Sequence, residues 1–146
     1  MDRQVSSHDH KRILLVEDDL RIINFMQRGL EAEGITLDVA SAKTPAIHLT
    51  ESRRYDTIIL DIYLGDDDGL DVCRTLRQRS IDTPVLVMTA KDSTELREAS
   101  VKAGATAYLP KPFSFEDLLS TLGRMRQAYL TIDKAVPTGL PAQARA

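Results

Sequence analysis

Residues 13–18 read ILLVED, an unbroken apolar run that ends in two acids. A second apolar run, IIL at 58–60, ends in Asp61, and Lys111 lies within the stretch LPKPF at 109–113. Short continuous runs of Val, Ile and Leu are typical of parallel strands that are buried on both faces. In an open parallel sheet, ligands bind at the carboxyl ends of the strands. The sequence therefore predicts that these acids and the lysine meet at one edge of a sheet.

The charges of these residues suggest what the edge binds. Glu17, Asp18 and Asp61 would repel one another there unless a cation lay among them. Mg²⁺ is a hard cation that prefers oxygen ligands, and Mn²⁺ is an acceptable substitute. Lys111 would then face a bound anion with its compact positive charge. The pattern indicates a site that handles phosphoryl groups with Mg²⁺ as cofactor.

The rest of the chain alternates between strand-like and helix-like stretches. Strands are predicted at 12–17, 36–41, 57–61, 84–89 and 106–109. Helices are predicted at about 19–33, 43–53, 69–79, 93–103 and 114–129. Five strands alternating with five helices predict an α/β fold, in which right-handed crossovers build a doubly wound parallel sheet.

The two ends of the chain lack this alternation. Residues 1–11 are polar, and we expect a disordered N-terminal tail there. The α/β domain is expected to span residues 12–130. Residues 131–146 contain small residues and two prolines, so a linker or disordered C-terminal tail is predicted.

The composition fits one globular domain. With 146 residues, 42% of them hydrophobic and 28% charged, the chain has room for one domain with its own core. A net charge of -3 argues against a free-standing nucleic-acid binder, because phosphate backbones attract basic surfaces. The single Cys73 permits no internal disulfide, is expected in the core, and fits a cytoplasmic location. No signal peptide or membrane span is expected, since the apolar runs are short.

Three consecutive acids at 66–68, followed by Gly69, are similar to part of a calcium-binding loop. In such a loop the ligands alternate with other residues, and a glutamate supplies the last ligand. Here Leu64 and Thr75 would fill the first and last ligand positions, so this interpretation fails. A solvated acidic loop is expected instead.

From Arg12 to about Tyr129 the chain resembles the receiver domain of two-component response regulators, with a CheY-like fold. Within that family it is most similar to the OmpR/PhoB-type branch. The resemblance rests on the motif residues Ile13–Asp19, Asp61, Asp68-Gly69, Thr89-Ala90, Tyr108 and Lys111-Pro112-Phe113. It implies a five-stranded sheet in the order 2-1-3-4-5 and a phosphorylation-dependent signalling role.

The resemblance also implies a role for each acid and for the lysine. Asp61 is expected to be the phospho-acceptor, since a carboxylate can form an acyl phosphate with a transferred phosphoryl group. Glu17, Asp18, Asp61 and the backbone carbonyl of Tyr63 are expected to hold Mg²⁺. Lys111 would contact the phosphoryl oxygens. The phosphoryl donor implied is a histidine kinase or a phosphotransfer protein.

Further family positions belong to a conformational switch. Thr89, followed by Ala90, is expected to donate a hydrogen bond to the phosphoryl group. Tyr108 occupies the place of the family's switch aromatic and would turn inward behind Thr89. The Lys111–Pro112 bond is expected to be cis, which is common only before proline.

The dimer face typical of the OmpR/PhoB branch is incomplete here. Thr106 and Ala107 replace acids before the switch aromatic, and Thr121 replaces a basic residue in the last helix. Arg97 and Asp117 remain as one cross-interface pair. We therefore expect a chain that is mainly monomeric, with at most weak association after phosphorylation.

Two alternative functions are compatible with parts of this pattern. In one, the chain is the receiver part of a transcriptional regulator whose winged-helix DNA-binding domain lies beyond Ala146, and the chain alone binds no nucleic acid. In the other, the protein is a Mg²⁺-dependent phosphatase similar to haloacid dehalogenases. Those enzymes need a second acid two residues after the nucleophile, where this sequence has Tyr63. A phosphoacceptor module rather than an enzyme is therefore the preferred interpretation.

Overall fold

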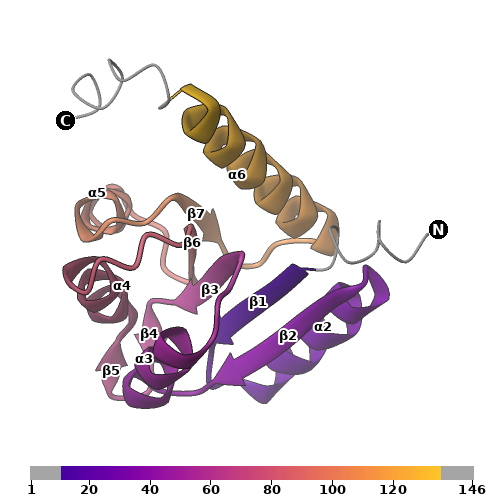
Figure 1. Cartoon of the computed structure of the whole chain (residues 1–146). Helices are drawn as coiled ribbons and strands as arrows, with labels where there is room; N and C mark the ends of the chain where they lie inside the picture. The colour runs from indigo at the N-terminus through magenta and orange to yellow at the C-terminus, as the bar shows by residue number, and fades with distance from the viewer. Residues whose placement is uncertain (1–10, 136–146) are drawn as a thin grey trace.

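The computed structural model describes residues 11–135, and side chains as far as residue 127. Its main sheet contains five strands in the order β2-β1-β3-β6-β7, and all neighbours run parallel (Figure 1). The strands are β1 (Lys11–Val16), β2 (Ile35–Ala40), β3 (Thr57–Asp61), β6 (Val85–Thr89) and β7 (Ala107–Pro110). The predicted fold class and the strand order 2-1-3-4-5 are confirmed.

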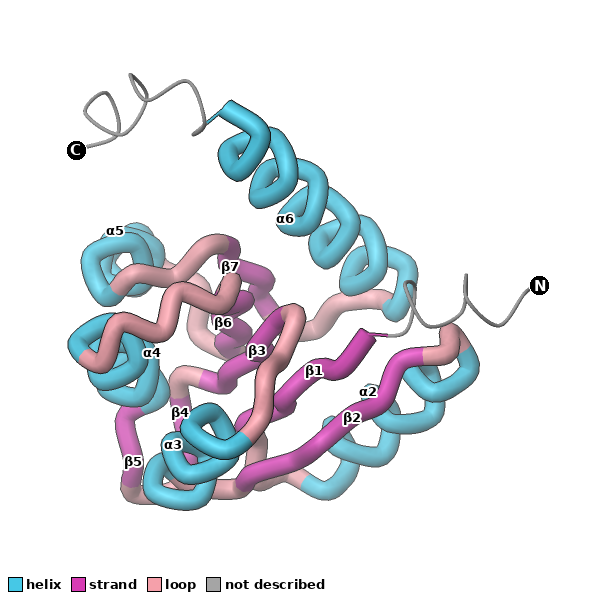
Figure 2. The backbone as a smooth tube through the Cα atoms, viewed as in Figure 1, coloured by secondary structure: helices cyan, strands magenta, loops and turns pink. Residues whose placement is uncertain are grey.

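Five helices cover the two faces of this sheet, with α3, α4 and α5 on one side and α2 and α6 on the other (Figure 2). They are α2 (Leu20–Ala32), α3 (Lys43–Ser52), α4 (Gly69–Gln78), α5 (Thr94–Ala103) and α6 (Phe115–Ala135). None of the helices within residues 11–135 combines the length and apolarity needed to cross a membrane.

Burial on both faces explains the unbroken apolar runs. In β1, Leu14 and Val16 pack with α3 and α4, whereas Ile13 and Leu15 pack with α2 and α6. A strand whose alternate side chains all enter a core has no position for a polar residue until it ends. Cys73 is fully buried on α4, as predicted.

Polar residues fix where the helices begin. The side chain of Asp19 accepts a hydrogen bond from the Arg21 amide at 2.9 Å and caps α2. Ser114 and Asp117 bond each other's backbone amides at 2.9 and 3.3 Å, which forms a reciprocal cap on α6. At the other end of α5, Gly104 has a left-handed φ of 100°, which glycine adopts without a steric penalty.

A small hairpin after β3 was not predicted. Strands β4 (Tyr63–Leu64) and β5 (Asp67–Asp68) pair antiparallel across a turn at Gly65. The expectation of a merely solvated acidic loop is therefore wrong for two of its residues. Asp67 accepts a hydrogen bond from the Lys43 amide at 2.8 Å, and Asp68 caps α4 by accepting from the Leu70 amide at 2.9 Å.

The last helix is longer than predicted, because α6 runs to Ala135 and so includes the start of the predicted linker at 131. The physical reason is the position of the next helix breaker, which is Pro137. Of the predicted tails at 1–11 and 131–146, residues 1–10 and 136–146 lie outside the described residues.

Arg77 joins three segments at the amino-terminal edge of the sheet. One of its terminal nitrogens, Nη1, donates to the carbonyls of Ile81 and Thr83 at 2.8 and 2.9 Å. Nε and Nη2 donate to the Gly104 carbonyl at 3.0 and 2.8 Å. The guanidinium of Arg77 thus links the end of α4, the loop before β6 and the end of α5.

Candidate functional site

The predicted residues meet at the carboxyl ends of the strands. The Lys111 ammonium lies 2.8 Å from Asp61 Oδ2 and 3.3 Å from Glu17 Oε1. Glu17 follows β1, Asp61 ends β3, and Lys111 follows β7. Glu17 is 1% exposed and Asp61 5% exposed, so these charges interact with little screening by water.

The remaining carboxylate oxygens are held by the backbone. Glu17 Oε2 accepts hydrogen bonds from the amides of Asp18 and Asp19 at 3.2 and 3.1 Å. Asp61 Oδ1 accepts from the Tyr63 amide at 3.0 Å. Each buried carboxylate therefore has one oxygen fixed by main-chain donors and the other directed at the lysine.

Burial and crowding of these charges shift their protonation. Burial, followed by the charge of Asp61, raises the pKa of Glu17 to about 7. Burial alone would lower the pKa of Lys111, but its hydrogen bond to Asp61 and the charges of Asp61 and Glu17 outweigh that effect, so its pKa is raised. The lysine therefore stays positively charged at neutral pH.

Asp18 completes the acidic set from a different position. Its side chain is exposed, and a Cβ built on Gly65 would lie 3.4 Å from Asp18 Oδ2. Asp18 thus faces the turn of the small hairpin, whereas Glu17 and Asp61 face Lys111. The Lys111 ammonium lies between these two acids.

The donor set bears on metal binding. Within residues 11–127, no three His, Cys, Asp or Glu side chains converge into a ready-made cage for a metal ion. Mg²⁺ does not need such a cage, since it keeps several waters and binds through one or two carboxylates together with phosphate oxygens. Carboxylates from Glu17, Asp18 and Asp61 at one edge of the sheet fit that requirement.

Gly69 allows the end of β3, which carries Asp61, and α4 to approach closely. A Cβ built on Gly69 would lie 2.0 Å from the Asp61 carbonyl oxygen. The Gly69 amide donates to the Ile62 carbonyl at 2.7 Å. The sequence marked Asp68-Gly69 only as a turn, and the close contact with Asp61 was not predicted.

The hydroxyl of Thr89 is buried and bonded to the loop that follows β6. Thr89 Oγ1 accepts from the Lys91 amide at 3.0 Å and donates to the Lys91 carbonyl at 3.3 Å. Ala90, between them, is exposed. Thr89 therefore lies at the end of a strand adjacent to the one that carries Asp61, with its hydroxyl engaged by its own loop.

Tyr108 is held by two charged residues that sequence reasoning did not place near it. Its hydroxyl donates to Asp92 Oδ1 at 3.1 Å, and the Arg97 guanidinium lies 4.6 Å from its ring centroid. Arg97 also bonds both carboxylate oxygens of Asp92 at 3.0 Å. No sequence signal distinguishes Asp92 from any other exposed loop acid.

Two further features concern the loops around the site, one a side-chain contact and the other a peptide-bond conformation. Lys91 lies with its ammonium 5.8 Å from the Tyr63 ring centroid, another contact that the sequence did not indicate. The Lys111–Pro112 bond is cis, as predicted. Tyr63 itself is 47% exposed, so its ring lies at the surface beside Asp61.

The side chains at the predicted dimer interface form hydrogen bonds or ion pairs within the chain. Arg97 pairs with Asp92, and Asp117 takes part in the cap of α6. Thr121 is buried, and its hydroxyl donates to the Asp117 carbonyl at 2.8 Å. The structure thus gives each of these side chains a local partner.

Comparisons with known proteins agree with this arrangement. The family model described as response regulator receiver domain matches residues 13–123. Response regulator MprA of Mycobacterium ulcerans is 41% identical over 125 residues, covering 85% of this chain and 54% of that protein. The same protein of Mycolicibacterium vanbaalenii is 42% identical over 111 residues, covering 76% of this chain and 48% of that one. The chain thus spans about half the length of these curated relatives.

Solved structures give the same result. The receiver domain of the Francisella response regulator 1452 has a TM-score of 0.76 and 32% identity, covering 82% of this chain and 98% of that one. The Vibrio cholerae chemotaxis protein CheY4 has a TM-score of 0.76 and 30% identity, with 80% and 98% coverage. Together with the receiver-type sheet order and the acids and lysine at its edge, these matches show that the chain belongs to the response regulator receiver domain family.

Proposed function

We propose that this chain accepts a phosphoryl group on Asp61 from a histidine kinase or a phosphotransfer protein. The observation that carries the proposal is the 2.8 Å contact between Lys111 Nζ and Asp61 Oδ2 in a nearly buried site. A carboxylate oxygen of Asp61 attacks the phosphorus of a phosphohistidine, so a P–O bond forms while the P–N bond breaks and imidazole leaves. Lys111 then neutralises charge on the phosphoryl oxygens.

Mg²⁺ is proposed as the cofactor of this reaction. Glu17, Asp18, Asp61 and the backbone carbonyl of Tyr63 would hold it, with Mn²⁺ as a substitute. When bound, the ion supplies positive charge to the transferring phosphoryl oxygens. The chain contributes a buried, acidic edge that attracts a divalent cation and a lysine that faces the incoming anion.

A two-state switch follows from the same geometry. With a phosphoryl group on Asp61, Thr89 would exchange its bonds to Lys91 for one to the phosphoryl group. Tyr108 would leave Asp92 and turn inward, which alters the surface of α5 and β7. The phosphoryl group shifts the population between two arrangements, since it interacts with only one of them.

The cellular location of the chain, its role in its own phosphotransfer and its lack of DNA binding are also proposals. The chain is proposed to act in the cytoplasm, as a phosphoacceptor module that assists its own phosphotransfer and dephosphorylation rather than as an enzyme with a separate substrate. On its own it is proposed to bind no specific DNA, in keeping with its net charge of -3. Nanomolar, site-selective DNA binding at physiological salt would contradict this.

One alternative output is favoured by a specific observation. The chain spans about half the length of the curated relatives, which leaves room in such proteins for a further domain. The alternative is therefore a receiver that controls a winged-helix DNA-binding domain. The phosphoryl-accepting role of Asp61 is the same in both cases.

The test is phosphorylation by a small phosphodonor with Mg²⁺, followed by intact mass. The wild-type chain should gain one phosphoryl group that hydroxylamine removes, and Asp61→Asn should gain none. Asp66→Asn is the matched control, because Asp66 is an exposed acid in the adjacent hairpin turn. Equal labelling of Asp61→Asn would refute the assignment.

A further inference from the structure

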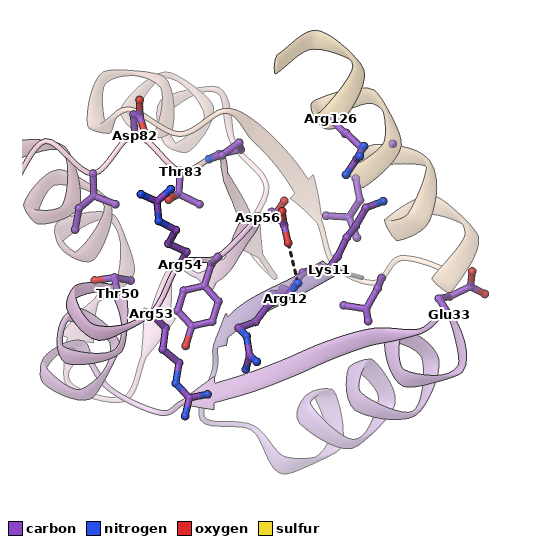
Figure 3. A pocket seen from close by; sticks show the side chains of 18 of the residues that line it. Lys11, Arg12, Glu33, Thr50, Arg53, Arg54, Asp56, Asp82, Thr83 and Arg126 are labelled. Carbon is purple, nitrogen blue, oxygen red and sulfur yellow. Dashed lines mark hydrogen bonds between the residues drawn. The ribbon is translucent and has the colours of Figure 1, made fainter. Parts of the chain in front are cut away.

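A cavity lies at the opposite edge of the sheet from the acidic site. It has a volume of about 950 Å³ and is bounded by the amino-terminal starts of β1 and β3, the loop before β6, and α6 (Figure 3). Cavities of roughly 300–1,000 Å³ hold small organic ligands in proteins. The acids and the lysine of the phosphorylation site do not line it.

The lining of this cavity is rich in positive charge. Five cationic side chains and three acidic ones contribute to it, although the chain as a whole carries a net charge of -3. The cations are Lys11, Arg12, Arg53, Arg54 and Arg126, and the acids are Glu33, Asp56 and Asp82. A surface concentration of positive charge on an acidic protein is a site for anions.

Two of the five cations already have an acidic partner. Arg12 and Arg53 both contact Asp38, at 3.4 and 3.1 Å, and the hydroxyl of Tyr55 donates to the same carboxylate at 2.6 Å. Asp56 uses one carboxylate oxygen to accept from the Arg12 amide at 2.8 Å, the bond drawn in Figure 3. These contacts stiffen the floor of the cavity at the starts of β1 and β3.

The other three cations are free to bind a ligand. Within residues 11–127, Lys11, Arg54 and Arg126 form no ion pair with any acid. In Figure 3 the side chains of Lys11 and Arg126 extend toward one another from β1 and α6, while the Glu33 carboxylate points away. Lys11 and Arg126 therefore face the same part of the cavity, whereas Arg54 lines another part of it, beside Thr83.

Apolar side chains form part of the same lining. Ile13 and Ile35 contribute from the starts of β1 and β2, and Leu119 and Leu122 contribute from α6. The leucines are partly buried at the edge of the core, so their outer surface faces the cavity. A purely inorganic anion would leave this surface against water, whereas a ligand with an apolar body would cover it.

We infer that this cavity binds an organic anion that has an apolar body, independently of phosphorylation at Asp61. The anionic group would contact Lys11 and Arg126, and the apolar body would cover Leu119 and Leu122. Arg contributes paired donors for a carboxylate, sulfonate or phosphate, and Lys contributes a point charge.

The test uses 8-anilinonaphthalene-1-sulfonate, an aromatic sulfonate whose fluorescence rises on binding, added to the full chain. Saturable binding with one site is expected, and Arg126→Glu and Lys11→Glu should each weaken it about tenfold. Arg124→Glu is the matched control, because Arg124 is exposed on the same helix and does not line the cavity. Circular dichroism would confirm that each variant is folded.

Several outcomes would overturn the inference. One is equal weakening by Arg124→Glu, which would indicate an effect of overall charge. Another is loss of binding in Arg28→Glu alone, which would place the probe in the shallow groove beside Phe25 and Phe115. Equally tight binding of the neutral N-phenyl-1-naphthylamine would remove the anionic requirement. Asp61→Asn should bind the probe as the wild type does, so failure of the phosphoryl proposal would leave this result unchanged.

Discussion

At the scale of single residues, Lys111 determines the charge balance of the proposed phosphorylation site. Its ammonium contacts two carboxylates that are almost fully buried, Glu17 and Asp61. A buried charge that loses its partner is costly, because neither water nor a counterion compensates for it. The lysine therefore supports the folded state, in addition to its proposed contact with the phosphoryl group.

This balance predicts the behaviour of Lys111→Met. In metal-free buffer at pH 8, the variant should lose about 2 kcal/mol of unfolding free energy, since two like charges remain together. Mg²⁺ should restore part of that loss, and the variant should bind Mg²⁺ as tightly as the wild type does or more tightly. Urea unfolding with and without Mg²⁺ measures both effects. A variant with wild-type stability but weaker Mg²⁺ binding would contradict this role for the lysine.

At the scale of elements, α4 and β3 can meet only because the first residue of α4 is glycine. The Gly69→Ala variant would place a methyl group 2.0 Å from the Asp61 carbonyl oxygen, so the helix or the strand end must move. We expect a loss of at least about 2 kcal/mol in unfolding free energy and slower phosphorylation of Asp61. Urea unfolding and phosphodonor kinetics measure these changes.

Gly123→Ala is the contrasting variant. Gly123 lies within α6, and a Cβ there would meet nothing within 4 Å. Alanine is a better helix former, so this change should stabilise the fold by up to about 1 kcal/mol. Similar effects of the two substitutions would show that the close contact at Gly69 is not limiting.

The loop after β6 and helix α5 together hold Tyr108. Asp92 and Arg97 contact each other and the tyrosine, so removing either should favour the arrangement in which Tyr108 turns inward. Because these side chains are exposed, the effect should be small. Asp92→Asn should lower the half-saturating concentration of beryllofluoride, a phosphoryl mimic, a few-fold, as followed by amide chemical shifts. Glu98→Gln, at an exposed position on α5, should leave it unchanged. A change of the same size in both variants would argue against a specific role for the Asp92 contacts in holding Tyr108.

These elements also show which parts of the structure the sequence predicts and which it does not. Runs such as residues 13–16 predict buried parallel strands, because a strand covered on both faces carries apolar side chains at successive positions over a short length. The hairpin at 63–68 was missed, since two-residue strands have no periodicity. Contacts such as Tyr108–Asp92 join residues that are 16 positions apart and separated by α5, and neither spacing nor composition indicates them.

At the scale of the whole molecule, topology brings distant residues of the predicted site together. Glu17 and Lys111 are 94 residues apart, yet the strand order places their strand ends at one edge of the sheet. The basic cavity at the other edge was not anticipated. Its cations come from three distant stretches of the chain, Lys11-Arg12, Arg53-Arg54 and Arg126, and only the fold brings these stretches to one cavity.

The surface of the whole molecule also bears on assembly. A two-fold interface repeats each contact, so every missing pair is missed twice. Thr121 is buried and cannot pair with an acid, and Arg97 already bonds Asp92 within its own chain. The chain should therefore be mainly monomeric at micromolar concentration, with weak association at most when beryllofluoride occupies the site. Light scattering coupled to size exclusion measures this. A tight dimer that forms only with beryllofluoride and is broken by Arg97→Glu would contradict it.

The clamp formed by Arg77 has a consequence for how the molecule opens. Its four hydrogen bonds reach the carbonyls of Ile81, Thr83 and Gly104. If the end of α4 unfolds and Arg77 moves away, the carbonyl oxygens in the other two segments therefore lose their donor. Amide protons of α4, β6 and α5 should then exchange with solvent deuterium as one cooperative unit. In Arg77→Lys a single ammonium cannot reproduce the forked geometry, so the exchange rates of the three segments should diverge.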